Sequence, residues 1–302
     1  MKKKWIFLLR LGLALFLITF LISSIGIEKI IETIFKVNPL YGCLTFFCII
    51  ILFIISAFNV WILLRALNKI EFKAFLKVYA YSWSASLITP GQLGDASLII
   101  FLKRYGIPLR RTSIAYMIDK LITLLIFLFI ASYGSLFIFP ELKQLWKNVF
   151  AILFLGIVVT LILIKIFKNT SYILSSFRKK LYDIFSEILI YKNNWYVIVI
   201  NVSMTIIRWL TVTLCYYTSF MAFGKHVQWP DIAIIPIMSS IIGYIPVSVA
   251  GIGTVELTAI YLFSSRGIQN SVVLSCYLFL RFLQYALAAF LIIFSGSMRP
   301  KN

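Results

Sequence analysis

The sequence predicts an all-α polytopic membrane protein with six to eight transmembrane helices, in which two broken or re-entrant helical hairpins belong to an inverted repeat. Three observations support this fold class: an excess of apolar residues, an uneven distribution of basic residues, and two similar interruptions of apolar segments. Hydrophobic residues make up 62% of the 302 positions and charged residues 13%, whereas soluble domains are about half apolar and a quarter charged. The surplus has to face lipid, so residues 1–302 are expected to form one integral membrane domain.

Six apolar runs are long enough to cross a hydrocarbon core of about 30 Å. They are residues 5–27, 40–64, 113–139, 149–167, 195–223 and 270–296. The first run has a basic start and no A-x-A site after it, so we expect an uncleaved first helix rather than a signal peptide. Two further segments, about 74–102 and 232–265, are apolar but interrupted. Either each enters and leaves as a re-entrant hairpin, or each crosses twice and the total is eight spans.

Basic residues gather on one side of the predicted spans. Of the 29 Lys and Arg residues, 20 lie at the two termini and in loops expected to be cytoplasmic, and six lie in outer loops. This bias predicts a multi-pass protein of the cytoplasmic (inner) membrane with both termini in the cytoplasm. It also explains the net charge of +19, so we expect no nucleic-acid partner.

Metal and redox chemistry are not expected. The four cysteines all lie within apolar runs, and the chain has a single histidine. No pair of these residues has the spacing of metal ligands, and the pattern does not predict a disulfide framework. We therefore expect no metal and no cofactor.

The two interruptions resemble each other. The segment 82–107 reads SWSASLITPGQLGDASLIIFLKRYGI, and 243–268 reads GYIPVSVAGIGTVELTAIYLFSSRGI. A shift of 161 positions places Glu256 on Asp95, and it also aligns the Gly-Ile pairs that end the two segments. Each carboxylate follows a break that contains Pro and Gly. This joint match predicts an internal repeat.

The repeat is expected to be inverted. The first copy would cover about residues 40–139 and the second about 195–296, with the first helix (5–27) outside both. Three full spans separate the two breaks, and an odd number reverses the second copy, so the first break opens from the cytoplasm and the second from outside. Transporters of this kind bind substrates near the midplane, at the discontinuous helices.

The breaks themselves favour an anion site. Non-helical backbone cannot face lipid, because each unsatisfied peptide group costs several kcal/mol, so both breaks should point into protein or a wet cavity. A half-helix that begins near Gly91 or Gly251 would direct its free N–H groups and positive dipole end at a bound anion. The glycines would also let a ligand approach the backbone closely.

The candidate substrate-binding residues are the groups at the breaks and the charges inside the spans. They are Thr89, Pro90, Gly91, Gly94, Asp95, Asp119, Lys120, Arg208, Gly251, Gly253, Glu256 and Arg281. Intramembrane charges cost about 2.5–3.5 kcal/mol at the bilayer centre, so they should face the interior and be paired. Lys120 and Arg281 coincide under the repeat shift and are expected to hold an anionic headgroup, helped by Arg208; purely structural pairing stays open. Asp95 and Glu256 would cap the half-helices, pair with these cations, or bind a proton.

These motifs resemble a known family. Over about residues 5–296, the chain is similar to the flippase-like membrane domain of lysylphosphatidylglycerol synthases. The similarity rests on two groups of motifs. The first is TPGQLGD, followed by GI and the intramembrane DK, and the second is PVSVAGIGTVE, followed by GI and an Arg. The resemblance implies movement of a phospholipid or another lipid-linked phosphate headgroup between leaflets. The aminoacyl-transferase domain of full-length synthases is not expected here, so the resemblance implies translocation without synthesis and no enzyme activity.

Other functions stay open. A non-catalytic partner of an envelope or glycolipid synthesis enzyme fits the same features, as does a small-solute secondary transporter; assembly as a homodimer is also open. An intramembrane aspartyl protease that uses Asp95 and Asp119 is disfavoured, because GQLGD departs from the G-x-G-D motif and Leu280 stands at the repeat position of Asp119.

Overall fold

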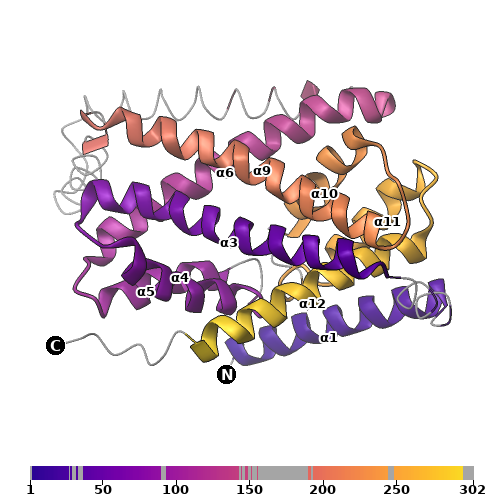
Figure 1. The fold of residues 1–302 in the computed structure, drawn as a ribbon, viewed down its shortest axis with the longest axis horizontal. Coiled ribbons are helices and arrows are strands. Elements are labelled where there is room, and N and C mark those ends of the chain that lie inside the picture. Colours follow the sequence, from indigo (N-terminus) through magenta and orange to yellow (C-terminus); the bar gives the residue numbers. More distant parts are fainter. Residues whose placement is uncertain are drawn as a thin grey trace.

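The computed structural model describes residues 2–26, 37–89, 93–142, 193–243 and 248–294, with a few isolated positions between these ranges. The described ranges form helices and contain no β-strand. The α-helices are α1 (Lys2–Ile25), α3 (Pro39–Leu67), α4 (Phe72–Ser86), α5 (Ser97–Lys103), α6 (Leu109–Ile138), α9 (Trp195–Ala222), α10 (Trp229–Gly243), α11 (Thr254–Ser264) and α12 (Asn270–Phe294). Two 3₁₀ turns, η1 (Leu93–Ala96) and η2 (Pro140–Leu142), complete them. The predicted all-α polytopic class is confirmed (Figure 1).

Four helices are long and apolar enough to cross a membrane: α3, α6, α9 and α12. They coincide with four of the predicted spans. The predicted first helix is present as α1, a helix of 24 residues. The predicted run 149–167 lies outside the described ranges apart from single positions. Large apolar side chains such as Phe47, Phe129 and Phe290 stay more than half exposed on these helices, as expected where lipid rather than water covers the surface.

Local signals in the sequence explain several helix ends. Asn38 caps α3, because its side chain accepts a hydrogen bond from the Leu40 N–H at 3.0 Å and Pro39 follows at the first helical position. This is the preferred chemistry of a helix N-terminus. The start of α3 is therefore determined by residues that adjoin it in the chain.

The repeated Gly-Ile pairs end α5 and α11. Gly106 has φ +74° and Gly267 has φ +75°, a left-handed conformation that glycine adopts without steric cost. The next residues, Ile107 and Ile268, donate their N–H groups back to Leu102 O and to Phe263 O, at 3.3 and 3.1 Å. This is the hydrogen-bond pattern of a Schellman C-cap. The two Gly-Ile pairs that helped to predict the repeat therefore form equivalent C-terminal caps of α5 and α11.

The two interrupted segments fold alike. In each, a helix of 15 residues, α4 or α10, is followed by a break and a second short helix. Helix α4 packs on η1 and α5, and α10 packs on α11. A long helix precedes each pair (α3, 29 residues; α9, 28 residues), and a long helix follows it (α6, 30 residues; α12, 25 residues). The order of the helices therefore matches between the two halves (Figure 1), although α6 and α12 differ in length.

Helices α3 and α9 run antiparallel. Thr45, near the start of α3, donates to Thr218, near the end of α9, at 2.9 Å. Asn59, near the end of α3, donates to Thr205, near the start of α9, also at 2.9 Å. The first helices of the two halves thus have opposite directions.

Two hydrophobic cores surround the two interrupted segments. The first contains Phe75 of α4 and Leu102 of α5, together with apolar residues of α3 and the beginning of α6. The second contains Leu21 of α1 and Phe263 of α11, with residues of α9, α10 and α12. Each short helix pair is therefore anchored in a core of its own, and the space between the cores is where the candidate site lies.

Candidate functional site

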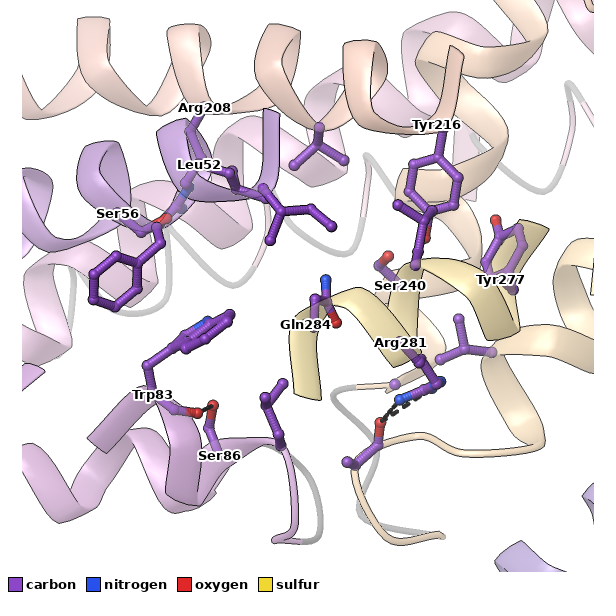
Figure 2. A pocket seen from close by; sticks show the side chains of 18 of the residues that line it. Leu52, Ser56, Trp83, Ser86, Arg208, Tyr216, Ser240, Tyr277, Arg281 and Gln284 are labelled. Carbon is purple, nitrogen blue, oxygen red and sulfur yellow. Dashed lines mark hydrogen bonds between the residues drawn. The ribbon is translucent and has the colours of Figure 1, made fainter. Parts of the chain in front are cut away.

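A cavity of 290 Å³ lies between the two interrupted segments. Its walls come from α3, α4, α6, α9, α10, α11 and α12, so both halves of the chain contribute to it. Figure 2 shows Trp83 and Ser86 of α4 on one side, with Arg281 and Gln284 of α12 across from them and Arg208 on α9. The cavity is a meeting point of distant parts of the sequence.

The structure brings the three predicted cations to this one cavity. Lys120 of α6, Arg208 of α9 and Arg281 of α12 all line it. Arg208 is only 8% exposed and donates a hydrogen bond to the Thr123 hydroxyl. Lys120 lies with its Nζ 5.3 Å from the centre of the Tyr116 ring, a cation–π distance. Three helices that are far apart in the chain thus direct positive charge at a shared space.

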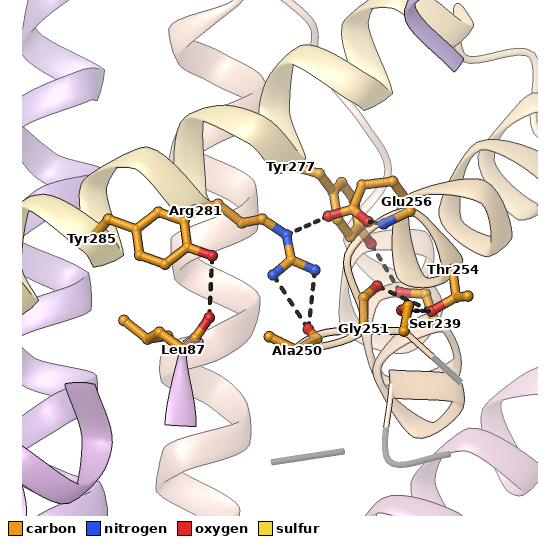
Figure 3. A network of polar contacts seen from close by, with 11 residues as sticks. Leu87, Ser239, Ala250, Gly251, Thr254, Glu256, Tyr277, Arg281 and Tyr285 are labelled. Atoms are coloured by element: carbon orange, nitrogen blue, oxygen red, sulfur yellow. Dashed lines mark hydrogen bonds and ion pairs between the residues drawn. The ribbon is translucent and has the colours of Figure 1, made fainter. Parts of the chain in front are cut away.

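Glu256 both caps α11 and pairs with a cavity cation. Its side chain is fully buried and accepts the Gly253 N–H at 2.7 Å. It also accepts a hydrogen bond from the Arg281 Nε, forming an ion pair (Figure 3). Both terminal nitrogens of the guanidinium, Nη1 and Nη2, donate to Ala250 O at 3.4 Å. Two of the roles expected for Glu256, capping and pairing, are filled together, so part of the charge of Arg281 is compensated from behind the cavity wall.

The glycines of the second break shape the backbone. Gly251 and Gly253 have φ +71° and +84°. Ala250, which precedes Gly251 and lines the cavity, has φ +50°. A Cβ on Gly253 would lie 2.4 Å from the Leu17 Cβ, and a Cβ on Gly251 would lie 2.8 Å from the Val255 side chain. The space beside Gly253 is occupied by α1, and neither glycine is among the cavity residues. Their visible role is a tight turn against α1 and α11.

The first break touches the second. Thr89 O accepts a hydrogen bond from the Ala250 N–H at 3.2 Å, and the Tyr285 hydroxyl of α12 donates to Leu87 O at 3.2 Å (Figure 3). Gly94 lies directly on α4, where a Cβ would come within 2.4 Å of the Ser86 backbone. The two interrupted segments, 161 positions apart in the chain, are therefore joined beside the cavity.

Part of the predicted first break lies outside the described residues. Pro90 and Gly91 are not described, and of Asp95 only the backbone is, within η1. The roles expected for these three residues stay predictions. Thr89 and Gly94 are described, and both contact α4 rather than the cavity.

Asp119 does not line the cavity with its neighbour Lys120. It is fully buried and accepts a hydrogen bond from the Asn201 amide at 3.2 Å. Asn201 also donates to Asn59 Oδ1 at 2.8 Å, and Asn59 donates to Thr205. The carboxylate therefore belongs to a buried polar cluster of α3, α6 and α9, which we call the Asp119 cluster: Asn59, Asp119, Asn201 and Thr205.

Sequence reasoning missed the aromatic and amide part of the site. Tyr79, Trp83, Phe127, Tyr216 and Tyr277 line the cavity beside the cations, as do Ser240 and Gln284. Aromatic residues are common throughout this chain, so composition did not single these out. A usable signal was Gln284, an amide inside an apolar run one turn after Arg281. Among the described residues, no group of three His, Cys, Asp or Glu could hold a metal ion.

These features define the class of protein. A helical chain with four apolar helices of spanning length, exposed apolar faces and a cation-lined internal cavity is a multi-pass membrane protein. The chain belongs to the family of the lysylphosphatidylglycerol synthase TM region, whose model matches residues 7–292. The family predicted from the two break motifs is confirmed. No curated protein matches the sequence significantly.

Proposed function

We propose that this protein is a lipid flippase, which moves an anionic or phosphate-containing lipid headgroup across the cytoplasmic membrane through the cavity and performs no enzymatic reaction. The observation that carries the proposal is the convergence of Lys120, Arg208 and Arg281 on one cavity between the two interrupted segments. The membership in a family of lipid-synthase membrane regions agrees with it. The partner would be a phospholipid or a lipid-linked phosphate headgroup.

The charge of the cavity supports an anionic ligand. Among the described residues that line it, there are three cations and no carboxylate. Glu256 pairs with Arg281 from behind the wall, whereas the described hydrogen-bond partner of Arg208 is a neutral hydroxyl, that of Thr123. A low-dielectric surrounding strengthens the attraction between such cations and an anion. An Arg side chain also presents several donors in a planar fork that suits phosphate oxygens.

The size of the cavity supports a headgroup rather than a whole lipid. Ligand pockets in proteins commonly span about 300–1,000 Å³, and this cavity of 290 Å³ is just below that range. The acyl chains of a lipid would stay in the bilayer, against the exposed apolar faces of the spans. The aromatic rings of Trp83 and Tyr216 offer flat surfaces against which the apolar part of a headgroup can pack.

The mechanism we propose is alternating access between inverted repeats. The shared order of helices, the paired Schellman caps and the antiparallel α3 and α9 support an inverted repeat. The two short helix pairs would be re-entrant hairpins that open to opposite leaflets in turn. The bias of basic residues supports cytoplasmic termini in the inner membrane.

The test is leaflet exchange by the purified protein in liposomes. Fluorescent lipids with anionic, zwitterionic and polyprenyl-phosphate headgroups would be compared in parallel. We expect headgroup-selective exchange, reduced at least about tenfold in Lys120→Gln and in Arg208→Gln, because each loses a charge-assisted contact worth about 1.5–3 kcal/mol. Arg65→Gln is the matched control, since Arg65 is an exposed cation over Trp61, away from the cavity, and its exchange rate should equal that of the native chain.

Two results would reject the flippase proposal. One is native exchange rates in both cavity variants. The other is an absence of exchange with every lipid by folded protein, which would favour a partner of an envelope-synthesis enzyme or a carrier of small solutes. Binding of a soluble phosphate compound to the folded protein would separate these two.

A further inference from the structure

The Asp119 cluster contains two unsatisfied acceptors. All four of its side chains, Asn59, Asp119, Asn201 and Thr205, are fully buried. Asp119 Oδ2 and Asn201 Oδ1 have no hydrogen-bond partner among the described residues. The two orphan atoms belong to the same pair of groups that already share a hydrogen bond, from Asn201 Nδ2 to Asp119 Oδ1 at 3.2 Å.

A single proton would satisfy both atoms. Buried polar atoms are almost always paired, and an unmade hydrogen bond costs about 1–3 kcal/mol. An ionised carboxyl can only accept, as can the amide oxygen, whereas a protonated carboxyl has one O–H to donate. With the proton on Oδ2, the carboxyl gains a donor, and the Asn201 oxygen is an unpartnered acceptor on the residue whose Nδ2 already donates to Oδ1. Protonation also removes a charge that burial makes costly.

No cation in the described part of the chain forms an ion pair with Asp119. Besides Asp119 itself, the charged side chains on α6 and on the helices packed against it are Arg65, Lys103, Arg110, Arg111, Lys120, Glu141, Arg208 and Asp231. Arg111 donates to Asn68, Arg208 to Thr123, and Asp231 pairs with Arg266. Lys103 and Arg110 are exposed, and the uncharged titratable neighbour on α6 is Tyr116, one turn before Asp119. The hydrogen bond that the described side chains donate to the Asp119 carboxyl comes from a neutral amide, that of Asn201.

We propose that Asp119 is a proton-binding site that couples headgroup binding to proton uptake, an inference that rests on the proposed lipid translocation. A proton from water forms an O–H bond at Asp119 Oδ2 and later returns to water from the same atom. Because Asp119 is fully buried between α3, α6 and α9, exchange with water requires these helices to part. Proton exchange is thus tied to a change of conformation.

The position of the cluster supplies the coupling. Lys120 directly follows Asp119, and Arg208 lies one turn beyond Thr205 on α9, so the same two helices carry the proton site and two cavity cations. Protonation removes one negative charge from this region, which makes the cavity more attractive to an anion. By thermodynamic linkage, the coupling between the two binding events is reciprocal. An anionic headgroup and a proton would bind cooperatively.

The first experiment detects the proton directly and needs no lipid movement. Infrared spectra of the purified protein, recorded across a pH titration, should contain the band of a protonated carboxyl that disappears at high pH. Asp119→Asn should lose this band. Asn201→Ala, which keeps the carboxyl and removes its acceptor, should shift the band. Asp231→Asn makes the same chemical change at another buried carboxyl, one paired with Arg266, and should retain the band.

The proposal would be overturned if Asp119→Asn kept the protonated-carboxyl band of the native chain. It would also be overturned if sodium ions removed the band at constant pH, since that would assign the cluster to a metal cation.

The second experiment applies a pH gradient across the liposomes used for lipid exchange. The gradient should change the exchange rate of the native chain and of Asp231→Asn but not of Asp119→Asn. If the lipid-exchange rate of the native protein does not depend on the pH gradient, proton coupling is refuted while the flippase proposal stands.

Discussion

Replacing Glu256 by Gln tests whether the second break is held together by a charge. Gln has nearly the same shape, and its Oε1 can still accept the Gly253 N–H that Glu256 accepts at 2.7 Å. The capping of α11 is therefore preserved. What is lost is the negative partner of Arg281, so the variant isolates the ion pair from the cap.

The expected loss of stability follows from burial. Glu256 is fully buried, and the Arg281 side chain is 18% exposed. Removing one partner of a buried ion pair costs about 3–5 kcal/mol, chiefly because the other charge is left uncompensated. Since Arg281 opens partly to the cavity and keeps Ala250 O within 3.4 Å, we expect a loss of about 3 kcal/mol in the free energy of unfolding.

The free energy of unfolding would be measured by reversible SDS titration in mixed micelles. The double variant Glu256→Gln/Arg281→Gln should be more stable than the sum of the single changes predicts, because it leaves no lone charge; coupling between contacting residues is about 0.5–3 kcal/mol. A loss below about 1 kcal/mol in Glu256→Gln, or strictly additive effects in the double variant, would refute the reasoning.

Two further predictions concern glycines with left-handed backbone. Gly253→Ala should destabilise the protein by more than about 2 kcal/mol, since it adds a Cβ 2.4 Å from the Leu17 Cβ to backbone strain at φ +84°; Leu17→Gly in the same chain, which removes the clashing Cβ, should restore part of the loss. Gly267→Ala has φ +75° but no atom within 4 Å of the added Cβ, so it should cost only the strain, about 1–2 kcal/mol. The same SDS titration ranks them, and a larger loss for Gly267→Ala would contradict this account.

The fold was predictable where local chemistry determines it. Length and apolarity identified α3, α6, α9 and α12 as spans, because the bilayer sets a minimum length for an apolar helix. The Gly-Ile pairs at Gly106 and Gly267 marked the ends of α5 and α11, because a Schellman cap depends on residues that adjoin it. The break at Gly251–Gly253 was visible for the same reason.

The candidate site was predictable in its charges and not in its assembly. Lys120, Arg208 and Arg281 stood out as cations inside apolar runs, since such residues are costly in a bilayer and rarely lack a role. That all three border one cavity, and that Glu256 lies behind Arg281, depends on contacts between helices distant in the chain. The hydrogen bond between the two breaks, from the Ala250 N–H to Thr89 O, also joins residues distant in the chain and was not predictable from either motif.

The sequence by itself determined the membrane class, the four spans α3, α6, α9 and α12, the two breaks and the family, because each rests on composition or on short-range motifs. Only the tertiary structure decided that Lys120 faces the cavity while Asp119 joins Asn59 and Asn201 in a buried cluster. Successive residues of a helix point roughly 100° apart. Which of two neighbours faces a ligand therefore depends on the rotation of α6 about its axis. That rotation is set by how α6 packs against α3 and α9, which is information that no local pattern contains.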